Sequence, residues 1–205
     1  AGIRAEGNEI DLAVRLSTFD MVPHRPDPEL STPGKLGPGI PEEHTTPYPY
    51  QFGVNPDDPT QIDLRETVAF VNLCGELGIK LLNTTAGSPY YTPHLQRPAA
   101  YPPSDGYQPA YDPLIDLARQ IEVVRHLKAG LPEGMAIIAS GLSYLQEYLP
   151  HVCQALLRDN WTDCVGLGRV VLSYPDILAA AMEQGGLEKR LICRTFSDGT
   201  TAPRK

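Results

Sequence analysis

The order of apolar and polar positions along the chain predicts four strands that alternate with four helices. Apolar runs typical of strands lie at residues 10–17, 79–87, 135–141 and 163–169. Stretches with the helical spacing of apolar residues follow them, at 63–77, 112–129, 144–158 and 175–184. The strand runs are almost continuously apolar, which is typical of parallel strands covered on both faces. Four strand–helix units with no hairpin pattern predict an α/β fold with a parallel sheet, namely a (β/α) half-barrel.

The sequence predicts the ends of one helix and the buried face of another. Asp63 is expected to cap the helix at 63–77, and Gly78 is expected to end it. In the helix at 112–129, seven apolar residues are expected to face the core: Leu114, Ile115, Leu117, Ala118, Ile121, Val124 and Leu127.

Two long segments show neither pattern, and we expect them to be loops. They are residues 18–60 and 88–111, and they hold much of the chain's proline. Segments of this length are either functional or disordered. We interpret the aromatic run at 48–53 as a segment that packs over a site or over a neighbouring chain. Residues 88–111 follow a strand, so they should lie at the edge of the sheet where α/β proteins bind ligands.

Composition narrows the class of protein. The 205 residues carry a formal net charge of -8, which argues against a nucleic-acid or anionic-membrane partner. No apolar run approaches the length of about 18 residues that predicts a membrane span. The four cysteines are far apart, so reduced thiols and a cytoplasmic location are expected. The histidines lack partners at metal-ligand spacing, and no metal site is predicted. We expect one domain over residues 1–205, and the start at Ala1 is interpreted as that of a truncated fragment.

The last predicted strand ends in the residues that best indicate ligand chemistry. Gly166, Gly168 and Arg169 follow an apolar run, where backbone N–H groups and a guanidinium can bind an anion. The glycine pair alone is a weak pattern, and Gly166 could instead permit close packing. Ser140 and Gly141 end the preceding strand. In a (β/α)₈ barrel, phosphate commonly binds after strands seven and eight, so these residues predict a phosphate site.

Further candidates lie near the other strands. Arg15 stands inside an apolar strand, which is unusual unless it meets an anionic side chain or an anionic ligand. Tyr90, Tyr91 and His94 follow the second strand, where they could either approach a substrate or only cover the rim of the sheet.

Taken together, these motifs resemble the C-terminal half of the old yellow enzyme family, which comprises NADH:flavin oxidoreductases and NADH oxidases. The resemblance covers the whole chain and rests on Val14–Ser17, Ala139–Gly141, Val165–Arg169, Tyr174–Asp176 and Ile192–Arg194. It implies strands five to eight of a TIM barrel. It also implies an FMN cofactor, NAD(P)H as reductant, and a small-molecule substrate such as an activated alkene.

The resemblance assigns roles to individual residues. Arg15 matches the strand-five arginine that reaches the flavin ring. The residues that match the phosphate-binding strand ends are Ser140, Gly141, Gly166, Gly168 and Arg169. Tyr90, Tyr91 and His94 lie where the strand-six loop approaches the substrate. The groups that bind the substrate carbonyl and donate a proton belong to the missing N-terminal half, so no catalytic residue is assigned and the fragment is not expected to be active alone. Cys193 stands alone, so no iron–sulfur cluster is expected.

Two other functions stay open. The chain could be a non-catalytic half-barrel assembly module that pairs with itself or with a missing N-terminal half, because a half-barrel has open edges and an uncovered inner face. It could also be a different phosphate-binding barrel for a sugar or nucleotide phosphate, which would need no arginine in the first strand.

Overall fold

A four-stranded parallel sheet forms the centre of the fold, as the sequence predicts. The computed structural model of the chain describes residues 2–7, 9–100, 106–183 and 185–193. The strands run in the order β1 (Ala13–Ser17), β6 (Leu81–Thr85), β7 (Ala136–Ala139) and β8 (Cys164–Val165). Arg15 pairs with Asn83, Asn83 with Ile138, and Ile138 with Cys164. The four strands are shorter than predicted, because the flanking residues of each apolar run belong to connecting segments.

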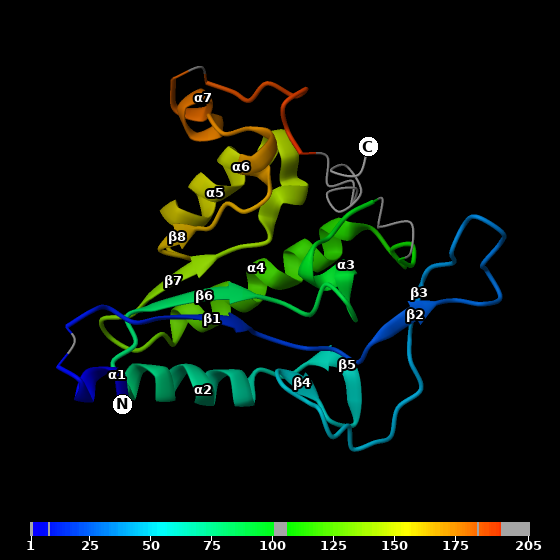
Figure 1. Ribbon diagram of the computed structural model, residues 1–205, viewed down its shortest axis with the longest axis horizontal. Coiled ribbons are helices and arrows are strands. Elements are labelled where there is room, and N and C mark those ends of the chain that lie inside the picture. The colour runs from blue at the N-terminus through cyan, green and yellow to red at the C-terminus, as the bar shows by residue number, and fades with distance from the viewer. Residues whose placement is uncertain (1, 8, 101–105, 184, 194–205) are drawn as a thin grey trace.

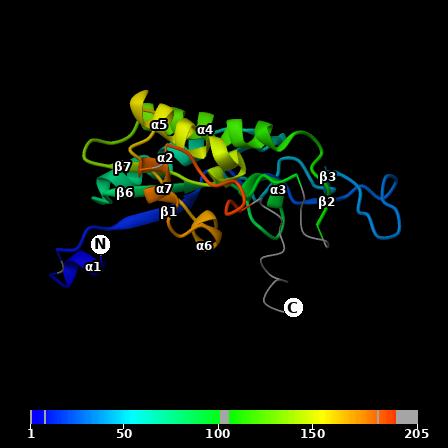
Figure 2. The ribbon, with the colours of Figure 1, turned by 90° about the horizontal axis from the view of Figure 1, so that it is seen from above.

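Helices follow the strands in the predicted order (Figure 1). Their bounds are α1 (Gly2–Ala5), α2 (Arg65–Glu76), α3 (Pro93–Gln96), α4 (Pro113–Ala129), the 3₁₀ helix η1 (Leu142–Tyr148), α5 (Leu149–Arg158), α6 (Val170–Ser173) and α7 (Ile177–Glu183). Figure 2 shows α4 and α5 on the same side of the sheet. On that side, Leu82, Ile137 and Ala139 are buried in one core with residues of α2 and α4.

The opposite face of the sheet is largely open, so the coverage of both faces that the apolar runs predict is wrong, whereas the uncovered inner face expected of a half-barrel is observed. Side chains alternate between the two faces of a strand. On the face opposite Leu82 and Ile137, Ala13, Arg15 and Cys164 are exposed. In a closed barrel this face would be the interior. The apolar composition of the strands is therefore compatible with a half-barrel, although burial on both faces is not seen.

Capping and glycine chemistry fix the ends of α2 and α4. The side chain of Asp112 accepts the Leu114 N–H at 2.9 Å at the start of α4. Asp63 lies one residue before the N-cap position of α2, which is Leu64, but its carboxylate still accepts the Arg65 N–H at 3.1 Å. Gly78, with φ of 71°, follows the end of α2 as predicted.

Two predicted helices differ from the structure. The stretch at 144–158 forms most of η1 and then α5, and η1 is itself interrupted at Gln146, where φ is 50°. A four-residue helix, α6, begins directly after Arg169, and α7 begins only at Ile177 instead of at Pro175. Gln184, the predicted end of the last helix, lies outside the described residues.

The segment at 18–60 is not devoid of regular structure, so the prediction of no hairpins is wrong. Two antiparallel pairs form, β2 (His24–Pro26) with β3 (Gly39–Pro41), and β4 (Val54–Asn55) with β5 (Asp58–Ile62). Most of these strands are too short to show an alternating pattern in the sequence. The segment is anchored to the core by Phe19, which is fully buried, and by the Thr67 hydroxyl, which donates to the Thr18 carbonyl at 2.7 Å.

Candidate functional site

A cavity of about 490 Å³ lies at the C-terminal ends of the four parallel strands, and we name it the strand-end cavity. All six residues predicted to bind a cofactor line it: Arg15, Ser140, Gly141, Gly166, Gly168 and Arg169. The topology explains why residues so far apart in the sequence meet. Parallel strands end at the same edge of a sheet, and β1, β6 and β7 point the same way in Figure 1.

The strand-end cavity is positively charged in a chain that is negatively charged overall. Its lining includes Arg15, Arg97 and Arg169, and none of its described lining residues is acidic. Arg15 and Arg169 are exposed, and neither forms an ion pair with any described residue. Because nothing in the described chain neutralises these two guanidinium groups, the cavity attracts an anion.

Backbone donors stand beside Arg169. Within the described residues, the N–H groups of Gly141, Gly168 and Arg169 have no hydrogen-bond partner. In the part of the chain that the structure describes, no heavy atom lies within 4 Å of the place where a Cβ of Gly168 would stand, so a ligand can approach the backbone there. Gly141 has φ of 84°, and a Cβ on it would lie 2.6 Å from Gln120 Oε1. Glycine is therefore required at 141 by conformation and by space.

Gly166 and Ser140 contribute differently from the prediction. The Gly166 N–H donates to the Ala139 carbonyl at 2.7 Å, so it is not available to a ligand. A Cβ on Gly166 would lie 3.3 Å from both Ile138 Cγ2 and Ser140 Cβ, which favours the close-packing interpretation of this glycine. The Ser140 hydroxyl donates to the Thr84 carbonyl. Both residues shape the cavity wall, and the hydrogen of the Ser140 hydroxyl is already used.

Two acceptors in the cavity wall lack donors. Asn83 Oδ1 and Gln96 Oε1 are buried atoms that find no hydrogen-bond partner among the described residues, and both residues line the strand-end cavity. A buried acceptor without a donor costs about 1–3 kcal/mol, so such atoms favour a ligand that supplies N–H or O–H groups. Neither residue could be identified from the sequence, because an Asn inside a strand and a Gln in a segment predicted to be a loop are not distinctive.

His94 lies outside the strand-end cavity, contrary to its grouping with the substrate residues. It lines a second cavity of about 270 Å³, which we name the histidine cavity, together with His24, Tyr107, Tyr111 and Arg119. Tyr90 and Tyr91 line neither cavity, and the two residues are 87% and 60% exposed. The structure therefore does not bring the three predicted substrate residues together at the strand ends.

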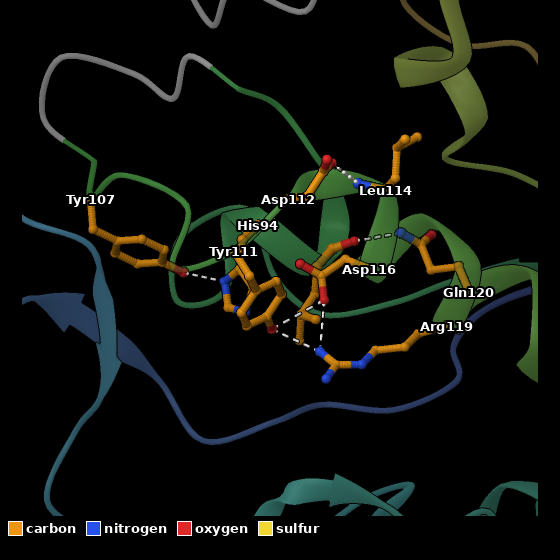
Figure 3. A network of polar contacts seen from close by, with 9 residues as sticks. His94, Tyr107, Tyr111, Asp112, Leu114, Asp116, Arg119 and Gln120 are labelled. Atoms are coloured by element: carbon orange, nitrogen blue, oxygen red, sulfur yellow. Dashed lines mark hydrogen bonds and ion pairs between the residues drawn. The ribbon is translucent and has the colours of Figure 1, made fainter. Parts of the chain in front are cut away.

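Two polar networks border the histidine cavity (Figure 3). His94 Nδ1 and Tyr107 Oη share a hydrogen bond of 2.6 Å. Arg119 donates to Asp116 Oδ1 at 3.0 Å and to Tyr111 Oη at 2.7 Å, and Tyr111 in turn donates to Asp116.

Burial sets the protonation of these groups. It lowers the pKa of His94 to about 3, with the nearby His24 and Arg119 adding to the effect. Burial also lowers the pKa of His24 and raises that of Tyr107. It raises the pKa of Asp116 to about 6, against the opposing effect of Arg119.

The buried polar residues of α4 were missed because the helix is turned differently from the prediction. Leu114 and Ile115 are exposed, while Asp116 and Gln120 are buried. Gln120 donates to the Leu95 carbonyl at 2.6 Å. The buried positions follow helical spacing, and a polar pair four residues apart on that stripe is the pattern that could have identified them.

Neither a metal site nor a membrane span is found in the described residues. No group of three or more His, Cys, Asp or Glu side chains in this part of the chain could hold a metal ion. No helix there is long and apolar enough to cross a membrane. No protein-family model matches the sequence, and a search of curated proteins finds no match either. Function must therefore be inferred from the groups that line the cavities.

Proposed function

We propose that the strand-end cavity binds FMN and that the chain is the FMN-binding portion of an NAD(P)H-dependent flavin oxidoreductase, of the ene-reductase or NADH oxidase type. In this proposal the four strands are strands five to eight of a TIM barrel. The observation that carries it is the meeting of Arg15 and Arg169 with the ends of β7 and β8 in one cavity whose described lining has no acidic residue.

The lining groups fit the parts of FMN. Arg169 and the N–H groups of Gly141 and Gly168 would hold the phosphate. The unpaired acceptors of Asn83 and Gln96 would take N–H and O–H donors of the ring and ribityl chain. Arg15 would place a positive charge beside the ring and stabilise negative charge there. FMN itself supplies the hydride-transfer chemistry between NAD(P)H and a small substrate.

The chain's own contribution is binding and orientation. The described lining contains no carboxylate and no histidine. It therefore offers neither of the side chains that most often act as general acid or base, and we assign no catalytic residue. All four cysteines are free thiols, which supports a reducing compartment such as the cytoplasm.

A pair of ligands that differ only in phosphate tests the proposal. FMN and riboflavin are titrated against the chain, and quenching of flavin fluorescence is measured. Arg169→Ala is expected to weaken FMN binding about ten- to a hundred-fold while leaving riboflavin nearly unchanged, because only FMN carries the anion. Arg158→Ala, which removes an exposed arginine of α5 outside the cavity, is the matched control. Equal binding of FMN and riboflavin, or an unchanged FMN affinity in Arg169→Ala, would contradict the proposal.

The same titration separates FMN from other phosphate ligands. Ribose 5-phosphate lacks the flavin ring but keeps a sugar phosphate. It should displace FMN only at a concentration far above that of FMN itself. Displacement at equal concentration would instead support a barrel that recognises a sugar phosphate.

The open sheet face favours a second candidate function, which is self-association. Ala13 and Cys164 are exposed there, beside the half-buried Ile138. A second copy of the chain could cover this face. Sedimentation equilibrium should then show a dimer that Ala13→Glu dissociates and that Ala179→Glu, on the exposed side of α7, does not. A monomer at all concentrations would exclude this function.

A further inference from the structure

The histidine cavity is built by segments that the parallel sheet does not require. Its walls come from β2, β3, β5, α3 and α4. Backbone hydrogen bonds join these segments directly. The Gly39 N–H donates to the Gln108 carbonyl at 2.8 Å, and the His24 N–H donates to the Tyr91 carbonyl at 2.9 Å. The cavity is thus held by main-chain contacts and is preorganised.

Aromatic rings are packed closely around this cavity. The rings of His24 and His94 have centroids 4.6 Å apart, and those of His94 and Tyr107 are 5.5 Å apart. A Cβ on Gly39 would lie 2.4 Å from Tyr107 Cδ2, so the backbone of β3 rests against the tyrosine ring. Flat rings on several sides favour a flat, aromatic occupant.

The charges of the histidine cavity cancel internally. The single arginine of its described lining, Arg119, is paired with Asp116, which is only 2% exposed. Burial keeps His24 and His94 uncharged at neutral pH, because it lowers the pKa of both. An ionic ligand would find no free counter-charge among the described lining residues. The volume of about 270 Å³ lies just below the range of about 300–1,000 Å³ that is typical of drug-sized ligands, so the occupant must be small.

His24 offers a hydrogen-bond acceptor to a ligand through one of its ring nitrogens. His24 Nδ1 donates to the Val22 carbonyl at 2.8 Å, and a carbonyl can only accept. In the neutral ring the proton therefore stays on Nδ1, and Nε2 is an acceptor. A ligand that donates one hydrogen bond would satisfy it.

We propose that the histidine cavity is a second binding site, distinct from the strand-end cavity, for a small uncharged aromatic molecule that donates one hydrogen bond to His24. The proposal does not depend on FMN binding. Indole is a suitable probe, because it is uncharged, flat and has one N–H donor. Indene has the same shape without the donor, and indole-2-carboxylate adds a negative charge.

NMR titration of the full chain, which follows the ring signals of His24 and His94, tests this proposal. Indole should bind saturably. Indene and indole-2-carboxylate should each bind about ten-fold more weakly, the first because His24 Nε2 stays unpaired and the second because its charge is buried without a partner. Equal or tighter binding of either competitor would overturn the proposal, as would the absence of saturable indole binding.

Variants locate the binding. His24→Phe keeps a ring but removes the acceptor, and it should weaken indole about ten-fold. His44→Phe is the matched control, because exposed His44 makes the same kind of bond, from Nδ1 to the carbonyl of Glu42 two residues earlier, outside the cavity. Ala110 is exposed and lines the cavity, so Ala110→Phe should block indole without disturbing the core. Unchanged indole affinity in Ala110→Phe would place the binding elsewhere and overturn the proposal.

Discussion

The strand-end cavity and the histidine cavity share their dividing elements but differ in charge. On α3, His94 lines one cavity and Gln96 the other, and on α4, Arg119 lines one and Gln120 the other. Each cavity contains arginine. Arg119 is neutralised by a buried carboxylate, whereas Arg169 forms no ion pair with any described residue. The partners of an arginine, more than its presence, therefore decide whether a cavity attracts an anion.

The largest expected effect concerns His94, whose pKa of about 3 lies below its ordinary value of 6.5. The unfolded chain binds a proton at this residue between those pH values and the folded chain does not. Stability from this residue is therefore lost as the pH falls from 6.5 toward 3. The free energy of unfolding of the wild type should fall relative to that of His94→Gln by about 3 kcal/mol as the pH is lowered from 6.5 to 4. Chemical unfolding at a series of pH values measures this difference. A constant difference across this range would show that His94 is not buried in its uncharged form.

Asp116 should behave in the opposite way, because its folded pKa of about 6 lies above its ordinary value of 3.8. Here the folded chain keeps the proton that the unfolded chain loses, so stability falls as the pH rises through this window. The free energy of unfolding of the wild type should fall relative to that of Asp116→Asn by about 2–3 kcal/mol as the pH is raised from 4 to 6.

Asp159→Asn is the control for this measurement. The side-chain hydrogen bond from Arg158 lowers the pKa of Asp159, although burial opposes the effect. The difference between this variant and the wild type should therefore move the other way as the pH rises. The same direction for both aspartates would contradict the assignment of Asp116.

Two glycines of the strand-end cavity should differ in their tolerance of a side chain. Gly141→Ala is expected to lower the free energy of unfolding by about 2 kcal/mol, because φ is 84° and the new Cβ meets Gln120. Gly168→Ala should change it by less than about 0.5 kcal/mol, because no heavy atom of the described residues stands near its Cβ position. Thermal or urea unfolding measures both, and equal losses would contradict the described backbone of these loops.

The smallest expected effect is a change in flavin affinity when an arginine of either cavity is replaced. Arg15→Gln should weaken FMN and riboflavin alike by about ten-fold, because in the proposal it contacts the ring that both share. Arg119→Gln should leave both affinities unchanged, although it breaks the ion pair with Asp116. Weaker flavin binding in Arg119→Gln would mean that the two cavities are not independent.

Sequence reasoning recovered the parts of the molecule that depend on repeated local patterns. The order of strands and helices follows from the apolar spacing, and the meeting of Arg15, Ser140 and Arg169 follows from the geometry of parallel strands. The open sheet face follows from the number of strands, because four strands cannot close a barrel, but the apolar composition of each strand does not show it, since a strand in a half-barrel has the composition of one in a closed barrel.

The histidine cavity was beyond sequence reasoning for a different reason. Its walls depend on strands of three to five residues and on long-range backbone contacts such as that between Gly39 and Gln108. Asp116 and Gln120 were missed because the apolar residues Leu114 and Ile115 beside them indicated a different buried side of α4, although the polar pair has helical spacing.

The short helix α3 limits how the protein can be re-engineered. Leu95 is fully buried between His94 and Gln96, and its carbonyl is held by Gln120. A designer who reshapes one cavity through this helix therefore alters the wall of the other. Selectivity at either site is best changed from the far walls, through Ala110 for the histidine cavity and Leu172 for the strand-end cavity, since both residues are exposed and neither belongs to the shared partition.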